Sequence, residues 1–243
     1  MLRKNNIPFS KRGLTMIELT MVLIASSILI SVIYSVEKSI EAAKIASAIN
    51  LTAQSNIREN DNLVLWLETS TMSREKKVND TVKTWTDLSK NRIVFKPASS
   101  SPTVKAEKVF DGIKGIYFNG TNYFQSDNAL NLKKYTAFVV SKPDNTSSVS
   151  LFDSGFLVKS SEISNGRVVV VKNDGTKKYI KRKNNENFKE ITNSDVLNNR
   201  PSKFYIGNGG FKGEILEIII FDKVLSNKEI TKIENYLYNK YMR

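Results

Sequence analysis

Acidic side chains are the groups in this chain best suited to chemistry, because two other reactive types are missing. The sequence contains no histidine and no cysteine. This removes the usual general base of serine and cysteine hydrolases, the commonest transition-metal ligand, and all thiolate and disulfide chemistry. Catalysis would therefore have to use carboxylates, lysine, tyrosine or a serine–lysine pair.

A glycoside hydrolase is one enzyme class that works with carboxylates alone. It needs two of them about 5–9 Å apart on the same side of the substrate. Glu214 and Glu217 share a predicted strand, but they are three positions apart, and alternation along a strand predicts opposite faces. Glu68 and Asp87 lie in separate segments, and nothing in the sequence brings them together. We therefore predict no catalytic residues and expect that the chain is not an enzyme.

Calcium is the metal ion that these acids suit best, because it prefers clusters of hard oxygen ligands. The candidate ligands are aspartates near Asn/Gly turns: Asp87, Asp111, Asp127 and Asp153. Asp87-Leu88-Ser89 and Asp153-Ser154-Gly155 are more often simple Asx turns than metal sites. A calcium site is thus a possible prediction at these positions, and no other cofactor is expected.

Aromatic side chains could stack on sugar rings, but their sequence context favours the core. Trp66 and Trp85 lie among apolar or alternating residues, which predicts burial. Tyr123 and Phe124 follow an Asn-Gly turn, and loop aromatics can be exposed. The sequence gives no defined ligand site.

The N-terminal region contains a long apolar segment. Leu14–Tyr34 is free of Gly and Pro and carries one charge, Glu18. A helix of that length spans roughly 31 Å, about the hydrocarbon core of a bilayer. A secretory signal peptide has a shorter apolar region, so we predict a membrane anchor. Four cations precede it without any acid, as expected for a cytoplasmic flank: Arg3, Lys4, Lys11 and Arg12.

Glu18 is out of place in an ordinary anchor, because a carboxylate in an apolar segment is costly without a partner. The motif Lys11–Glu18 (KRGLTMIE), followed by the apolar run, resembles the leader and N-terminus of type IV prepilins. The resemblance implies cleavage by a prepilin peptidase between Gly13 and Leu14, N-methylation of Leu14, and a role of Glu18 in assembly. Two residues depart from the family: Leu14 replaces the usual Phe, and Ser35 lies where the family often has Pro.

The remaining sequence predicts a stem helix followed by a β-rich domain. An amphipathic pattern continues the helix to about Ile57. From Leu63, short segments with period-two patterning and turns between them predict an antiparallel sandwich. A capping box at Ser226–Glu229 predicts a short C-terminal helix. The fold class is thus α+β: a long N-terminal helix, an antiparallel β-sandwich of the jelly-roll kind and a C-terminal helix.

The β-rich segment resembles the laminin-G-like members of the concanavalin A-like lectin/glucanase superfamily. The resemblance extends over roughly residues 61–241 and is most specific in the stretch from Tyr205 to Leu237, which contains "FKGEILEIIIFDKVLSNKEI". It implies a jelly roll that binds glycans or surface proteins, sometimes with calcium. The predicted domains are a leader (1–13), a pilin-like helix (14–60, of which 14–34 is transmembrane) and a laminin-G-like domain (61–243).

These patterns together predict a type IV pilin-like subunit, either a minor pilin or a pseudopilin, that displays a domain for surface adhesion. The expected partners are prepilin peptidase, other pilin-like subunits with their assembly machinery, the membrane, and a glycan or surface-protein ligand. The expected location is the bacterial inner membrane and then a pilus or a type II secretion pseudopilus. The alternatives are a plain membrane-anchored domain that binds or hydrolyses glycans, and a DNA-uptake pilus component. The net charge of +13 would matter for a DNA-uptake component, although the sequence has no dense cluster of basic residues typical of a nucleic-acid-binding face.

Overall fold

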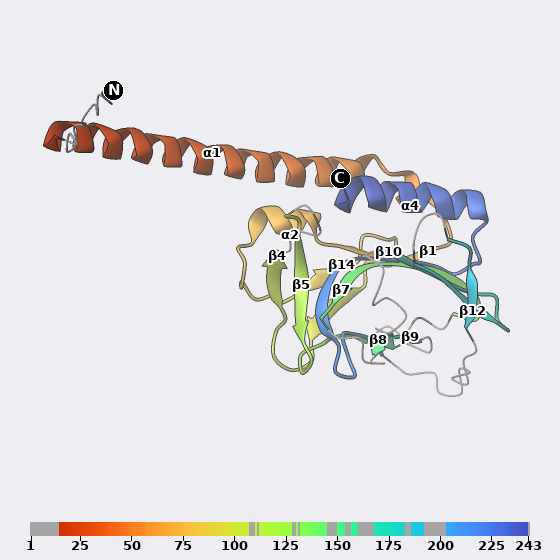
Figure 1. Cartoon of the computed structure of the whole chain (residues 1–243). Coiled ribbons are helices and arrows are strands. Elements are labelled where there is room, and N and C mark those ends of the chain that lie inside the picture. The colour runs from red at the N-terminus through yellow and green to blue at the C-terminus, as the bar shows by residue number, and fades with distance from the viewer. Residues whose placement is uncertain are drawn as a thin grey trace, which may run out of the picture. The chain divides into compact units, whose positions relative to one another are not determined.

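The computed structural model describes residues 15–106, 110, 112–127, 130, 132–144, 150–153, 157–159, 168–182, 186–191 and 203–242. The chain forms two compact units, residues 1–42 and 43–243. The first consists of helix in its described part, and the second contains both β-sheets and the C-terminal helix α4 (Figure 1).

Helix α1 (Met16–Gln54) begins at a capping box that the sequence analysis missed. Glu18 accepts hydrogen bonds from the backbone N–H of Thr15 (2.8 Å) and from its hydroxyl (2.9 Å), while the Glu18 N–H donates back to the Thr15 hydroxyl (3.3 Å). These bonds satisfy groups that a helix start leaves unpaired. No glycine or proline interrupts the helix, which ends before the short 3-10 helix η1 (Asn56–Glu59).

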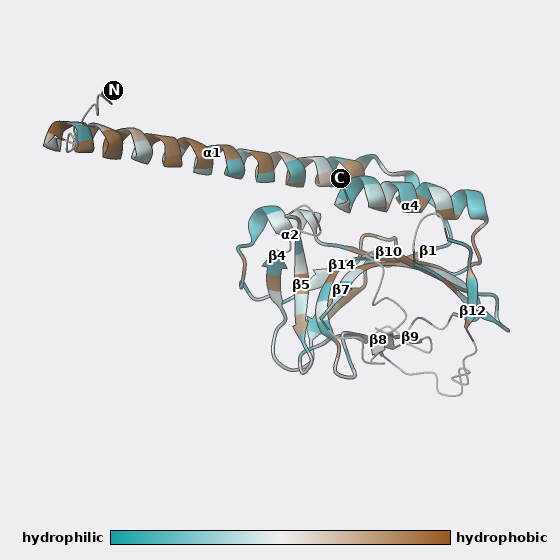
Figure 2. Cartoon of the chain, viewed as in Figure 1, coloured by the Kyte–Doolittle hydropathy of each residue, from teal (hydrophilic) through white to brown (hydrophobic). Residues whose placement is uncertain are grey.

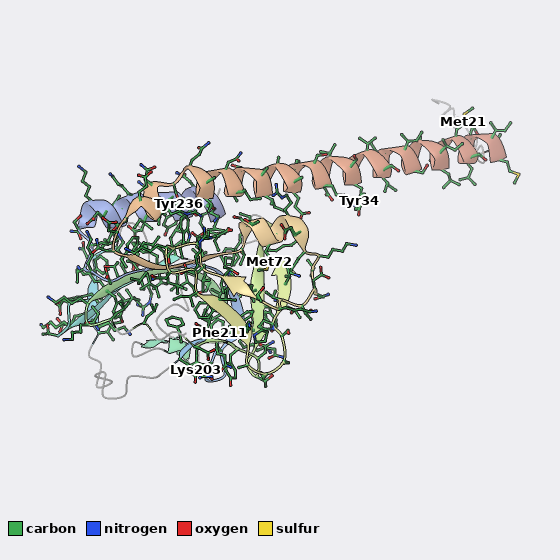
Figure 3. All side chains as sticks on the ribbon, turned by 180° about the vertical axis from the view of Figure 1, so that it is seen from behind. Met21, Tyr34, Met72, Lys203, Phe211 and Tyr236 are labelled. Atoms are coloured by element: carbon green, nitrogen blue, oxygen red, sulfur yellow. The ribbon has the colours of Figure 1, made fainter. Side chains whose placement is uncertain are left out.

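The α1 residues of the first unit are mostly hydrophobic, as the brown colour of this part of the helix shows (Figure 2). Every large apolar residue that the structure places outside the core between Met16 and Ile40 is at least 50% exposed. Met21 and Tyr34 show this directly, because both point away from the helix (Figure 3). One helix in the described part of the chain is therefore long and apolar enough to cross a membrane.

The second unit contains two antiparallel sheets. The larger has the order β12-β11-β10-β7-β14-β5-β4, with β1 also paired to β14, and the smaller has the order β2-β3-β6-β13-β8-β9. The strands of the larger sheet are β1 (Leu63–Glu68), β4 (Thr103–Ala106), β5 (Lys114–Asn119), β7 (Tyr135–Pro143), β10 (Val168–Asn173), β11 (Lys178–Lys181), β12 (Lys189–Ile191) and β14 (Lys212–Phe221). Those of the smaller are β2 (Trp85–Thr86), β3 (Val94–Pro97), β6 (Phe124–Ser126), β8 (Ser150–Asp153), β9 (Leu157–Lys159) and β13 (Phe204–Ile206). A short helix, α2 (Ser70–Glu75), follows β1.

Each face of the larger sheet has its own apolar core. One core lies between the two sheets and includes Leu65, Ile218 and Phe124. The other lies on the outer face, beneath the end of α1 and α4 (Asn227–Tyr241), and includes Trp66 and Ile219. Because both of its faces are covered, β14 is buried from Gly213 to Phe221, which explains its run of apolar residues.

The predicted fold class is confirmed: a long helix is followed by a two-sheet antiparallel sandwich and a C-terminal helix. The predicted capping box at Ser226 and Glu229 is present, and both tryptophans are buried, at 0% and 2% exposure. Strands β3, β4, β6, β9 and β12, each of three or four residues, and helix α2 were not predicted. Segments this short show too little periodicity to be recognised in a sequence.

Candidate functional site

Two glutamates lie side by side on the outer face of the larger sheet. Along β1, Leu65 and Leu67 point into the core between the sheets, so Trp66 and Glu68 point to the other side. Glu68 is the direct cross-strand partner of Glu217 on β14. The pairing of the strands therefore brings together two carboxylates that are far apart in the sequence.

A β-bulge in β14 corrects one prediction from the sequence. The register against β7 shifts between Ile215 and Glu217, so the chain has one extra residue at this point. Ile215 still packs between the sheets, whereas Leu216 and Glu217 both belong to the outer side. Glu214 precedes Ile215 and also points outward, so the expectation that Glu214 and Glu217 lie on opposite faces is wrong. The alternation rule fails because the bulge changes the phase of the strand.

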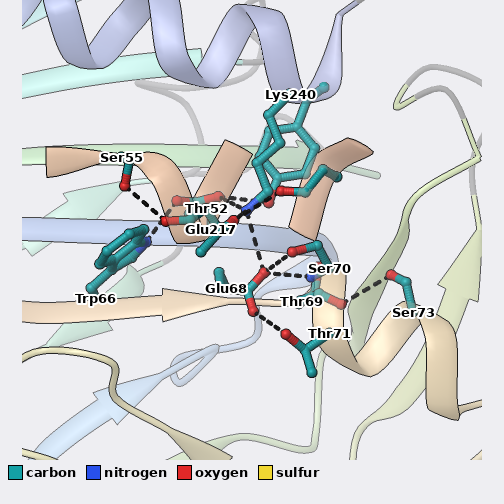
Figure 4. A network of polar contacts seen from close by, with 12 residues as sticks. Thr52, Ser55, Trp66, Glu68, Thr69, Ser70, Thr71, Ser73, Glu217 and Lys240 are labelled. Atoms are coloured by element: carbon teal, nitrogen blue, oxygen red, sulfur yellow. Dashed lines mark hydrogen bonds and ion pairs between the residues drawn. The ribbon is translucent and has the colours of Figure 1, made fainter. Parts of the chain in front are cut away.

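Lys240, from the last turn of α4, reaches down to both glutamates of the cross-strand pair (Figure 4). Its Nζ lies 2.8 Å from Glu217 Oε2 and 3.3 Å from Glu68 Oε2. The exposed fractions are 0% for the Lys240 side chain, 0% for Glu217 and 4% for Glu68. We call Lys240, Glu68 and Glu217 the buried triad. It places two acids and one base out of contact with water.

Glu217 accepts three further hydrogen bonds from aromatic side chains. Its Oε1 accepts from Trp66 Nε1 at 2.7 Å and from the Tyr236 hydroxyl at 2.9 Å. Its Oε2 accepts from the Tyr241 hydroxyl at 2.7 Å. Burial first, and then the negative charge of Glu217, raise the pKa of both tyrosines well above the ordinary value. The two phenols therefore keep their protons and act as donors.

Glu68 is held by the start of the segment that follows β1. One of its oxygens accepts from the Ser70 N–H at 2.6 Å and from the Ser70 hydroxyl, and the other accepts from Thr71 at 2.9 Å. Burial raises the pKa of Glu68, but the charge of Lys240 and these hydrogen bonds outweigh it and hold the pKa below its usual value. Glu68 is thus an ionised group that accepts hydrogen bonds.

The triad also fastens the end of α1 to the sheet. Lys240 Nζ donates to the Thr52 hydroxyl at 2.7 Å, and that hydroxyl lies 3.2 Å from the hydroxyl of Tyr236. Beside this junction is a cavity of about 530 Å³ between the end of α1, η1 and α4, lined by residues that include Leu51, Ile57 and Tyr236. Three segments that are distant in sequence therefore meet at Lys240.

This arrangement does not suit glycoside hydrolysis. Both carboxylates lie under α4 and α1 and are engaged by Lys240, so a sugar cannot reach them. What the geometry offers is an amine, a carboxyl group with donors on both oxygens, and a second carboxylate that can take up a proton. Glu68 and Asp87, the other pair considered from the sequence, have separate partners and separate roles.

The predicted calcium ligands are not gathered by the described residues. Asp87 is buried and accepts from the backbone N–H groups of Trp66 (2.7 Å) and Ser89 (2.8 Å), so it closes an Asx turn that covers the free edge of β1. Asp127 is 91% exposed and forms an ion pair with Lys203 at 3.3 Å. Asp153 lies in β8, and its side chain and the whole of Asp111 fall outside the described residues. Within the described part of the chain, no group of three or more potential ligands is assembled.

The predicted processing residues, Gly13 and Leu14, also lie outside the described residues. Glu18 is described, and its carboxylate is engaged by Thr15, as given above. The sequence analysis treated Glu18 as a carboxylate that is costly in an apolar segment without a partner. The structure adds a partner that this reasoning overlooked, namely the polar groups of the helix start itself.

The buried triad was missed by the sequence analysis, although signals for it are present. Glu68 ends a strand whose other residues are all apolar, and it is in phase with Trp66. Lys240 lies on the helix face that also carries Ile233 and Leu237, seven and three positions earlier. A charged residue in phase with apolar ones on two separate elements is the pattern expected of a buried ion pair.

Comparison with known proteins gives no family for this chain. No protein-family profile matches the sequence, and no curated protein matches it either. Solved structures with a similar fold include domain 4 of AbnA, an extracellular GH43 arabinanase from Geobacillus stearothermophilus solved with arabinotriose. It is 13% identical, with a TM-score of 0.49, covering 71% of this chain and 98% of that one.

Two further likenesses are to binding domains. One is a receptor binding domain, 14% identical with a TM-score of 0.48 over 75% of this chain. The other is the binding domain of botulinum neurotoxin DC in complex with rat synaptotagmin II, 14% identical with a TM-score of 0.45 over 73% of this chain. The match spans about half the length of these two chains, 53% and 52%. These similarities are too low to indicate a ligand for this chain.

Proposed function

We propose that this chain is an exported, membrane-tethered subunit that displays its β-sandwich as a binding domain, and that its tether is of the type IV pilin kind. The observation that supports the tether is the apolar surface of α1 between Met16 and Ile40, which is exposed on all sides within the chain. Such a helix needs lipid or other apolar helices around it. The pilin-specific part of the proposal rests on the leader motif that ends at Gly13 and on Glu18.

Processing is the first test of the pilin proposal. We expect co-expression with a prepilin peptidase to remove residues 1–13, so that N-terminal sequencing begins at Leu14. Gly13 offers a backbone without side-chain obstruction to the peptidase, so Gly13→Leu should block the cut and serves as the control. An unchanged N-terminus in the parent chain would reject the pilin proposal and leave a plain membrane anchor.

Assembly tests the role of Glu18 separately from its part in the helix cap. Glu18→Leu should still insert into the membrane but fail to enter filaments, whereas Glu37→Gln, which alters an exposed acid of the same helix, should assemble normally. Thr15→Val removes the hydroxyl of the cap and keeps the carboxylate. If Thr15→Val abolishes assembly as completely as Glu18→Leu does, the cap is what matters and the proposed charge role is wrong.

The ligand of the sandwich domain is proposed to be a glycan, because the laminin-G-like sequence resemblance implies that class. A glycan array with the purified full chain, in the presence and absence of EDTA, tests both binding and the calcium prediction. Binding that disappears with EDTA would support a calcium site at the predicted aspartates. Absence of any glycan binding would reject this part of the proposal and leave the tether proposal intact.

A further inference from the structure

The buried triad contains the groups that form an amide bond between side chains. We propose that Lys240 and Glu217 become joined by an isopeptide bond between Lys240 Nζ and Glu217 Cδ, with Glu68 as the proton acceptor. This inference is independent of the proposed function, because it concerns a covalent modification within the folded domain.

Proximity is the first argument. The amine nitrogen is 2.8 Å from one oxygen of the Glu217 carboxyl group, and both side chains have 0% exposure. Reacting groups held together in this way reach effective concentrations of about 10⁵–10⁸ M. Water, which would reverse the reaction, is excluded from the site by burial.

The donors around Glu217 supply the second argument. As Nζ attacks Cδ, negative charge develops on the carboxyl oxygens. Trp66 Nε1 and the Tyr236 hydroxyl lie 2.7 and 2.9 Å from Oε1, which is the distance range of an oxyanion hole. The Tyr241 hydroxyl lies 2.7 Å from Oε2, the oxygen that leaves. After the reaction, Oε1 remains as the amide carbonyl oxygen and keeps its two hydrogen bonds.

Glu68 supplies the base. Its Oε2 lies 3.3 Å from Lys240 Nζ, and the Ser70 and Thr71 bonds hold it in place. The step balances without any co-reactant. The ammonium of Lys240 has three protons, of which one stays on the amide nitrogen and two leave with Oε2 of Glu217 as water. Glu68 takes the first proton from the nitrogen and returns it to the leaving oxygen. One N–C bond forms and one C–O bond breaks.

The chain itself offers a matched comparison. Lys181 and Glu234 form a second buried ion pair at 2.7 Å, with exposed fractions of 9% and 2%. In the described part of the chain, the Lys181 ammonium contacts this carboxylate and the ring of Phe188. Among the residues that the structure describes, no second carboxylate contacts Lys181, and no set of donors like that at Glu217 surrounds Glu234. We expect this pair to remain an ordinary ion pair.

The bond would connect the last turn of α4 to the central strand β14 and close a loop of residues 217–240. The chain has no cysteine, so disulfides cannot serve this purpose. A bond of this kind would give a displayed domain resistance to unfolding that is independent of redox conditions.

Mass spectrometry of the full chain tests the inference directly. Under denaturing conditions, the intact mass should be about 18 Da below the mass calculated from its sequence, the mass of one water molecule. After trypsin digestion, peptide 213–223 should be joined to peptide 233–243, because an acylated Lys240 is no longer a cleavage site. The peptide that contains Lys181 should not be joined to peptide 233–243, which contains Glu234.

Two variants identify the roles. Lys240→Arg keeps the positive charge but has no nucleophilic amine, so its mass should equal the calculated value. Glu68→Gln keeps the shape and removes the base, so the joined fraction at a fixed time after synthesis should fall at least about tenfold. If either variant fails to fold, the mass of the unaltered chain still decides the question. A full calculated mass after prolonged incubation would overturn the inference, and so would a join that maps to Glu68 or to Lys181.

Discussion

Replacing Lys240 with methionine should be among the most destabilising substitutions in the second unit. Compared with the chain in which Lys240 is still an ammonium not joined to Glu217, methionine preserves much of the side-chain volume but leaves Glu68 and Glu217 buried without their cation. Breaking a buried ion pair from one side typically costs about 3–5 kcal/mol, because a charge remains that is neither hydrated nor paired. The exposed fractions of 0–4% place the triad in this class. We therefore expect Lys240→Met to lower the free energy of unfolding by about 3–5 kcal/mol.

The measurement is urea unfolding of the full chain in detergent micelles, followed by tryptophan fluorescence. Trp66 is a suitable reporter because its Nε1 donates to Glu217, and Trp85 reports on the core between the sheets. The matched control is Lys177→Met. Lys177 pairs with Glu190 at 3.1 Å, but the side chains are 55% and 46% exposed, so the loss should be within about 1 kcal/mol.

Acid pH gives a second check on the reasoning. In the unaltered chain with Lys240 still unjoined, the pKa of Glu68 lies below its ordinary value, so its contribution to stability is present above about pH 4.5 and is lost as the pH falls. In Lys240→Met the cation is gone and burial dominates, so Glu68 takes up a proton more readily in the folded state. The difference between the two proteins should therefore shrink between pH 7 and pH 4. A loss no larger than that of Lys177→Met, or a loss that grows on acidification, would refute the buried-charge explanation.

Two further substitutions test the helix cap and the packing of the sandwich. Ser226→Ala should lower the free energy of unfolding by about 0.5–2 kcal/mol at pH 7. Hydrogen bonds from Ser226, and then Lys223, lower the pKa of Glu229 to about 2. The cost of Ser226→Ala should therefore decrease as the pH falls from about 4.5 toward 2, which thermal melting would measure. Gly207→Ala should destabilise by roughly 2–5 kcal/mol, because φ is +78° and the new Cβ would lie 2.2 Å from the buried Phe118 ring. The control Gly112→Ala, where φ is +81° but nothing lies within 4 Å, should show only the backbone cost of about 1 kcal/mol, and equal losses at the two glycines would contradict the steric explanation.

The sequence by itself determined the elements with strong local signals. The apolar run from Leu14, the change to period-two patterning at Leu63 and the capping box at Ser226 depend on neighbours within a few residues. The strand that contains Glu214 and Glu217 was predicted for the same reason, and it is β14. Burial of Trp66 and Trp85 also followed, because their surroundings are apolar or alternating.

Only the tertiary structure decided which charged groups meet. Glu68 and Glu217 come together because β1 and β14 pair in one register, and the bulge before Glu217 sets which face it occupies. Lys240 reaches both because α4 packs across that face with its last turn above them. Register, bulges and helix packing depend on contacts between residues far apart in the chain, and local periodicity does not encode them. Glu18, which lacked an evident partner in the sequence, is engaged locally by Thr15. Lys240, which had no evident role in the sequence, lies at the centre of the buried network.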